Sequence, residues 1–198
     1  MTAVSVVFHS DSGTTKILAE GVCEGAASVA GVDATLYEVD RTKIVEGRFE
    51  DEPLLAALDA ADAIVFGCPT FMGDVSGPMK AFLDSALQRW YGRVWSGKVA
   101  GGFTVSSTPS GDKLHCLQSL MMQAMQHGMV WVGLDQSPLN AEALNRLGVY
   151  VGVAAQPDYA APPVGETPVL MPGDRETGVV HGARIARLAQ ALENTQSR

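Results

Sequence analysis

The sequence predicts an α/β fold in which helices cover both faces of a doubly wound, five-stranded parallel sheet with the strand order 2-1-3-4-5. Short apolar runs alternate with helix-like segments along the chain, which is the pattern of such a sheet. The first, third and fourth runs are apolar at nearly every residue, as strands covered on both faces must be. Polar turns follow these three runs, where doubly wound sheets place their ligand sites.

The elements can be placed in order. Strands are expected at residues 3–8, 34–39, 63–67, 98–105 and 129–132, and helices at 14–30, 77–89, 112–127 and 179–193, with a short helical piece at 54–61. Pro78 suits a first helical turn, Asp112 can cap the third helix, and Gly128 can end it. Residues 133–178 are rich in Pro and Gly and long for a structureless loop, so we expect them to be functional or to form an oligomer contact.

Composition limits the possible classes of protein. The length of 198 residues predicts a single domain, residues 1–198, with an extended loop at 133–178. The net charge of −8 argues against a nucleic-acid partner. No apolar run reaches the roughly 18 residues of a membrane span, so no integral membrane contact is expected. Three cysteines without a C-x-x-C pair argue against a disulfide framework and favour a cytoplasmic location.

Several familiar motifs are absent or misleading. The sequence contains no G-x-G, so it lacks a dinucleotide fingerprint, and no G-x-S-x-G hydrolase elbow. Residues 92–98 resemble a P-loop, but Val99 stands where Ser or Thr is needed, and a strand rather than a helix follows. The four histidines have no metal-like spacing with each other or with the cysteines, so no metal site is expected.

The turn between the first strand and the first helix suits a phosphate. Hydroxyl groups and a glycine there would join the free N–H groups of a helix N-terminus, where the helix dipole favours an anion. The candidate phosphate ligands are Ser10, Asp11, Ser12, Gly13, Thr14 and Thr15. The same residues also fit an ordinary helix cap, and the motif alone does not decide between the two.

Two further loops follow the third and fourth strands, which neighbour the first strand in the predicted order. They should therefore lie beside the phosphate turn, where they could clamp a flat ring between backbone amides and apolar side chains. Together the three loops predict a site for flavin mononucleotide (FMN). The candidate ring-binding residues are Pro69, Thr70, Phe71, Met72 and Gly73 in one loop, and Ser106, Ser107, Thr108, Pro109, Ser110 and Gly111 in the other.

A block of sequence resembles a known family. Residues 69–84, Trp90, residues 97–98, 106–108 and 127–129 look like the tryptophan-repressor-binding-protein (WrbA-like) family of flavodoxin-like NAD(P)H:quinone oxidoreductases. The resemblance implies a flavodoxin-like fold, FMN as cofactor, NAD(P)H as electron donor, and a homotetramer whose flavin sites are completed by a neighbouring subunit. It also implies that His127 lies near the flavin and that Trp90 lines the substrate face. His127 alternatively suits the end of a helix, as a cation against its dipole.

The predicted function is FMN-dependent, two-electron reduction of quinones by NAD(P)H. The flavin carries the chemistry, so no side chain need be catalytic. Ser12 and the pair Phe71–Met72 replace an aromatic residue and an Arg-Phe pair that family members usually carry, which indicates an altered contact with the electron donor. Two alternatives remain: a one-electron carrier of the flavodoxin type, whose acidic face would dock on a basic partner, and a non-enzymatic, FMN-binding interaction module.

Overall fold

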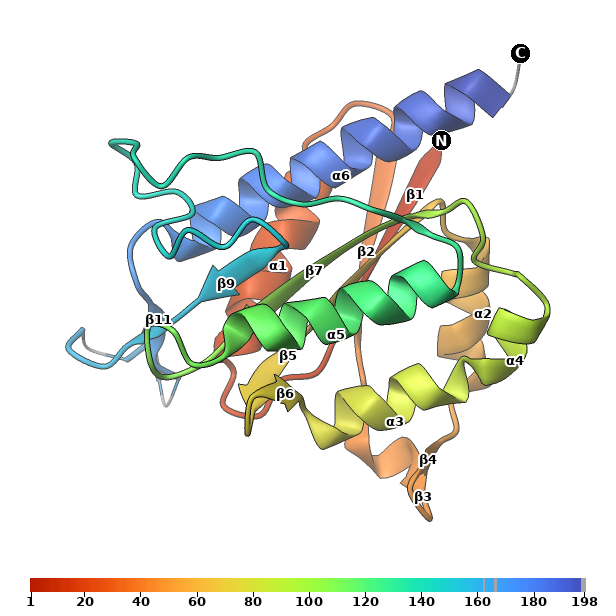
Figure 1. Cartoon of the computed structure of the whole chain (residues 1–198), viewed down its shortest axis with the longest axis horizontal. Coiled ribbons are helices and arrows are strands. Elements are labelled where there is room, and N and C mark those ends of the chain that lie inside the picture. Colours follow the sequence, from red (N-terminus) through yellow and green to blue (C-terminus); the bar gives the residue numbers. More distant parts are fainter. Residues whose placement is uncertain (162, 166, 197–198) are drawn as a thin grey trace.

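A parallel sheet forms the centre of the molecule (Figure 1). The computed structural model describes residues 1–161, 163–165 and 167–196. The main strands are β1 (Thr2–Phe8), β2 (Val32–Glu38), β5 (Ala63–Phe71), β7 (Val99–Val105) and β8 (Val130–Trp131), all pairing in parallel in the order β2-β1-β5-β7-β8. This is the predicted order 2-1-3-4-5, so the predicted fold class is confirmed.

The position of the fifth strand is shared by two short strands. Strand β8 pairs only with Val99 and Ala100 at the start of β7, whereas β9 (Val153–Ala155) pairs in parallel with the last three residues of β7. The chain between them leaves the sheet and returns, and the indole Nε1 of Trp131 donates a 2.7 Å hydrogen bond to the Val151 carbonyl where it comes back. The expected extended loop at 133–178 therefore contains a strand of the central sheet.

Helices cover both faces of the sheet, and two apolar cores separate them from it. On one face α1 (Thr14–Ala27) and α6 (Asp174–Gln196) bury residues such as Leu18 and Ile185. On the other face α2 (Glu52–Ala60), α3 (Gly77–Ser85) and α5 (Lys113–Gln126) bury residues such as Phe82 and Leu120. The short α4 (Leu87–Tyr91) follows α3 and has no buried residue. The helix predicted at 77–89 is divided at Ala86, whose ψ of 4° departs from helical geometry.

Glycines allow α1 and α6 to pack backbone against backbone. A Cβ atom added to Gly25 would lie 1.9 Å from the Val179 carbonyl oxygen, and one added to Gly182 would lie 1.9 Å from that of Val22. Any other residue at either position would push the helices apart. The two helices lie alongside each other in Figure 1, and their closeness brings the start of α6 to the carboxyl edge of the sheet.

Short hairpins complete the structure at the edges. The turn η1 (Arg41–Lys43) leads into the antiparallel pair β3 (Ile44–Val45) and β4 (Arg48–Phe49), and β6 (Asp74–Val75) folds back on β5. The strands β10 (Pro157–Asp158) and β11 (Val169–Leu170) form a third pair. None of the helices in these described residues combines the length and the apolar character that crossing a bilayer requires.

The segment that resembles a P-loop has a structural role instead. The Lys98 ammonium donates hydrogen bonds to the carbonyl oxygens of Asp59, at 2.8 Å, and Ala61. These carbonyls lie at the C-terminal end of α2, where the helix dipole favours a cation. Lys98 therefore ties α2 to the start of β7.

His181 is a fully buried imidazole on α6, packed over Gly101 of β7. A Cβ atom added to Gly101 would lie 3.1 Å from its Nε2, and neither ring nitrogen has a hydrogen-bond partner among the described residues. Burial lowers the pKa of His181 to about 4, with a further lowering by Arg184 and an opposing effect of Asp135. The folded protein therefore holds this imidazole in its neutral form.

We expect His181 to make the protein less stable as the pH falls from 6.5 to 4. In that range the unfolded chain binds a proton that the folded chain excludes, which costs about 3 kcal/mol at most across the window. His181→Leu should remove this part of the pH dependence, measured as the free energy of urea unfolding at pH 7, 5.5 and 4.5. The exposed His115 provides the control: if His181→Leu and His115→Leu give the same pH profile, the buried imidazole is not responsible.

Candidate functional site

Residues from all three polar loops meet in one pocket of about 250 Å³ at the carboxyl edge of the sheet. The segment around β10 closes a further side of it. Its lining consists of Asp11, Ser12, Thr14, Pro69, Thr70, Phe71, Val105, Ser106, Ser107, Pro157 and Tyr159. The expected meeting of the three loops is thus present in the structure, although not every residue named in those loops reaches the pocket.

The first turn has the features of an anion site. The N-cap of α1 is Gly13, which adopts a left-handed conformation (φ 88°) and offers no side chain to cap the helix. Ser10 instead reaches forward, and its Oγ accepts hydrogen bonds from the N–H groups of Gly13 (3.2 Å) and Lys16 (3.3 Å). The N–H groups of Thr14 and Thr15 have no acceptor within the described part of the chain, so they remain free to bind an anion.

The charge near this turn is balanced locally. Asp11 would repel a phosphate, but the Nη1 of Arg41 lies 3.0 Å from its Oδ1. Both side chains are more than half exposed, so the pair adds little to stability. Its consequence is electrostatic: η1 supplies a cation that offsets the carboxylate beside the open N–H groups.

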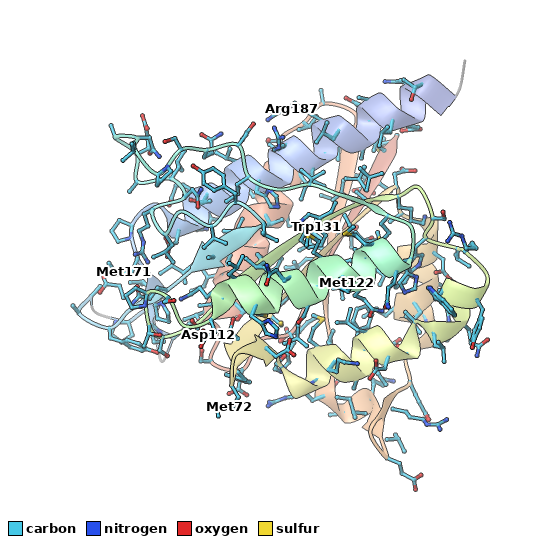
Figure 2. All side chains as sticks on the ribbon, viewed as in Figure 1. Met72, Asp112, Met122, Trp131, Met171 and Arg187 are labelled. Carbon is cyan, nitrogen blue, oxygen red and sulfur yellow. The ribbon has the colours of Figure 1, made fainter. Side chains whose placement is uncertain are left out.

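The second loop is a tight hairpin rather than an open loop. Strand β5 continues to Phe71, and Met72 and Gly73 form a two-residue turn with φ values of 49° and 84° before β6, as in a type I′ turn. Met72 is fully exposed at the tip, and neither turn residue lines the pocket. Figure 2 shows Met72 at the far end of the hairpin. Only Pro69, Thr70 and Phe71 of this predicted group reach the pocket.

The side chain of Thr70 is fixed by a buried hydrogen-bond network. Its Oγ1 lies 2.7 Å from the Oγ1 of Thr104, which in turn donates a 2.7 Å hydrogen bond to the carbonyl of Cys68. These three residues are buried. The network therefore satisfies polar groups beneath the pocket and fixes the end of β5 against β7.

The third loop contributes an unpaired polar atom to the pocket wall. The Oγ of Ser106 is buried and has no hydrogen-bond partner among the described residues, a rare state for a buried hydroxyl. The Oγ of Ser107 lies 3.0 Å from the Oη of Tyr159. An orphaned hydroxyl on a residue of the pocket wall is what a pocket built for a polar, ring-shaped ligand would contain, and in this respect the residues fit FMN.

The remainder of the third loop faces elsewhere. Pro109 and Ser110 line a separate hollow of about 650 Å³ on the outer side of the loop, next to α5 and Arg146. Gly111 has a φ of 52°, and a Cβ atom added there would lie 2.1 Å from the Oγ of Ser106. Gly111 thus shapes the loop without lining the pocket.

Besides Val105 at the end of β7, three residues at the pocket that the sequence did not predict come from one segment. Pro157 and Tyr159 line it directly, and a Cβ atom added to Gly13 would lie 2.7 Å from the Oγ1 of Thr167. All three come from the long segment 133–178. Its length alone indicated a functional or contact role, but no motif identified the particular residues.

Trp90 and His127 do not reach this pocket within one chain. They line a different one, of about 380 Å³, together with Leu83, Asp84, Leu87, Gln123 and Gln126. The reason is length: α3 and α4 together, and likewise α5, run back along the sheet for about 20 Å. Both residues therefore lie near the amino edge, where the Gly97 N–H donates to the Gly128 carbonyl just before β7 begins. The resemblance placed Trp90 on the substrate face and His127 near the flavin, and within one chain the length of these helices separates both residues from the pocket.

The environment of His127 disfavours a charged imidazole. Its ring lies 4.6 Å from that of Trp95, measured between centroids, and its Nδ1 is buried with no partner among the described residues. Burial lowers the pKa of His127. The alternative of a cation against the helix dipole is therefore not supported. Trp90 is 40% exposed and stacks edge-on against Tyr91 at 4.8 Å.

The doubly wound sheet and the pocket at its carboxyl edge define a flavodoxin-like protein. The chain belongs to the NADPH-dependent FMN reductase family, whose family model matches residues 8–143.

Similar proteins agree with this placement. A protein named flavodoxin FldP from Pseudomonas aeruginosa is 37% identical, over 97% of this chain and 99% of its own length. An NAD(P)H dehydrogenase (quinone) from Archaeoglobus fulgidus is 32% identical, over 97% and 100%. The crystal structure of a flavodoxin, WrbA-like protein from Agrobacterium tumefaciens superposes with a TM-score of 0.72 at 38% identity, covering 96% of this chain and 99% of that one. The resemblance inferred from the sequence is confirmed.

Proposed function

We propose that this chain is an FMN-dependent NAD(P)H:quinone oxidoreductase. The observation that carries the proposal is the single pocket in which an open helix N-terminus, the end of β5 and the unpaired hydroxyl of Ser106 meet. Relatives named NAD(P)H dehydrogenase (quinone), such as the one from Archaeoglobus fulgidus, and membership of an FMN reductase family support it. The activity would reside in a single domain, in the cytoplasm.

Each part of the pocket has its own role in this proposal. The N–H groups of Thr14 and Thr15 would bind the phosphate, with their hydroxyls as further donors. Pro69, Thr70 and Phe71 on one side and Ser106 and Ser107 on the other would hold the ring. When bound, FMN supplies the two-electron chemistry, while the protein binds, orients and shields it.

The pocket of Trp90 and His127 would act at the flavin site of a neighbouring subunit in a homotetramer. Three observations support this: the pocket lies too far from the FMN pocket of its own chain, Trp90 is partly exposed, and apolar side chains on α4 and α5, the helices that line it, and just after these helices are exposed too. Those side chains are Leu87, Tyr91, Val94, Met122, Met125 and Val130. An exposed apolar surface of this kind is typical of a contact between subunits.

A one-electron carrier is the second candidate, because a relative over the whole length is named flavodoxin. The net charge of −8 would suit docking on a basic redox partner. A stable one-electron-reduced flavin during reductive titration would favour the carrier. Direct two-electron bleaching by NADH or NADPH, with turnover when a quinone is added, would favour the oxidoreductase. A protein that fails to bind FMN would favour a non-enzymatic interaction module.

The first test is flavin binding by the purified protein. We expect FMN, rather than FAD, to bind stoichiometrically and to be bleached by NAD(P)H. Replacing Thr14 and Thr15 together by valine should weaken FMN binding at least tenfold, because each hydrogen bond to a charged group is worth about 1.5–3 kcal/mol. Affinity is measured by flavin-fluorescence titration. Riboflavin, which lacks the phosphate, is the matched ligand: its affinity should not change. Equal FMN affinity of variant and wild type would show that the turn is only a helix cap.

Tyr159 should stack on the flavin ring. It is 66% exposed, lines the pocket, and is held at its hydroxyl by Ser107. Tyr159→Leu should make bound FMN more fluorescent, since a stacked aromatic ring quenches flavin emission, and should weaken binding by a few-fold, in keeping with about 0.5–1.5 kcal/mol per aromatic pair. Tyr150→Leu is the control, because Tyr150 is exposed to 51% and does not line the pocket. Emission that is equally low in both variants would contradict the stacking.

Trp90 should matter for quinone turnover and much less for FMN retention. We expect Trp90→Ala to raise the quinone KM several-fold while flavin content stays near stoichiometric, because the side chain would meet the quinone from the neighbouring subunit. Light scattering should give a tetramer at micromolar concentration. A monomeric wild type would refute the shared site, and loss of FMN from the variant would assign Trp90 to the fold or the subunit contact.

A further inference from the structure

Lys113 is a buried lysine at the start of the helix that follows the third loop. It is the first residue of α5 and only 1% exposed. Its ammonium donates hydrogen bonds to the carbonyl oxygens of Thr108 and, at 3.3 Å, of Pro109. Burying an ammonium is costly unless it is well paired, and here the hydrogen-bond partners both belong to the third loop of the pocket.

A second side chain holds the same loop through a backbone carbonyl. The Nε2 of Gln156 donates a 3.0 Å hydrogen bond to the carbonyl of Ser107. Three consecutive carbonyls, those of Ser107, Thr108 and Pro109, are thus fixed by side chains rather than by secondary structure.

The hydrogen bonds to these carbonyls also fix the orientation of the N–H groups that follow them in the same peptide planes. No cis peptide occurs in the described chain, and in a trans peptide the C=O and the following N–H point in opposite directions. The N–H groups of Thr108 and Ser110 therefore point away from the groups that hold the carbonyls. Neither has an acceptor among the described residues, and Ser107, beside them, lines the pocket.

An ion pair acts electrostatically on the Lys113 ammonium. Arg146 binds Asp174 through two hydrogen bonds of 2.8 and 2.9 Å, and the Oδ2 of Asp174 also accepts the Gln156 N–H at 2.8 Å. Burial lowers the pKa of Lys113 to about 8, while Asp174 raises it and Arg146 lowers it. At neutral pH the ammonium is therefore mainly charged and poorly screened by solvent.

We propose that Lys113 is a positioning residue for the flavin: it holds the 106–111 loop so that Ser106 and Ser107 keep their places in the pocket wall, and its charge favours the reduced over the oxidised flavin. The inference rests on the proposed FMN site. The reduced ring carries more negative charge than the oxidised ring, so a buried cation behind the loop stabilises it more.

The test compares three variants by FMN affinity and by the two-electron midpoint potential of bound FMN. Lys113→Met removes both the hydrogen bonds and the charge, Lys113→Gln keeps a donor without the charge, and Lys113→Arg keeps the charge. We expect Lys113→Met to lose about tenfold in affinity for oxidised FMN and a further tenfold for reduced FMN, which lowers the potential by about 30 mV. Lys113→Gln should lower the potential similarly with a smaller loss of affinity. Lys113→Arg should stay near the wild-type potential.

Lys80→Met is the control, because Lys80 is an exposed lysine paired with Asp84 on α3; both quantities should match the wild type. If Lys113→Met does not fold, the comparison of the glutamine and arginine variants still decides. Equal potentials in the glutamine variant and the wild type overturn the electrostatic role, and an unchanged affinity in the methionine variant overturns the positioning role. A wild type that binds no FMN overturns the proposed function and this inference together, whereas normal FMN binding with silent Lys113 variants overturns the inference alone.

Discussion

The parallel register of β1, β5 and β7 is the constraint on which the rest of the structure depends. Phe8 pairs with Gly67, and Pro69 pairs with Val105, so the three strands reach the same edge at nearly the same height. All three are buried on both faces and can carry few polar groups. The polar side chains near these strands are therefore concentrated in the turns that follow them. Because the strands end at the same edge, these turns lie side by side.

Unpaired buried polar atoms have two different meanings in this protein. Ser106 and His181 both carry such atoms, but Ser106 lies in the wall of a pocket and His181 lies between α6 and the sheet. The first can be satisfied when a ligand enters. The second cannot, because Gly101 and Ile185 occupy the space around it, and it costs stability whenever acid supplies a proton. An unpaired buried polar atom is therefore a candidate ligand-binding group when its residue lines a cavity. Where there is no cavity, the same atom only lowers the stability of the fold.

The sequence predicted the strand order, the helices and the three loops, because apolar runs of strand length and helix-like spacing depend on neighbouring residues alone. It could not predict that β8 and β9 share the fifth strand position, since β9 is recognisable only by its contact with β7. Tyr159 and Lys113 were missed for the same reason: an exposed tyrosine and a lysine at a helix start look ordinary until the fold brings them to the pocket. The expected positions of Trp90 and His127 came from the resemblance to a family. A resemblance identifies matching residue types, but it does not show how far along a helix each residue lies from the pocket.

The long segment after β8 links the cofactor pocket to the stability of α6. It completes the sheet through β9, closes the pocket with Pro157 and Tyr159, and ends at Asp174, the first residue of α6. Asp174 holds Arg146 and the Gln156 amide together, and Gln156 reaches the carbonyl of Ser107. A ligand that binds only the folded pocket must therefore order this whole path, and by mass action its binding free energy is added to the stability of the folded chain. Because α6 packs against α1 through Gly25 and Gly182, that stabilisation extends to the helix whose N-terminus is the proposed phosphate site.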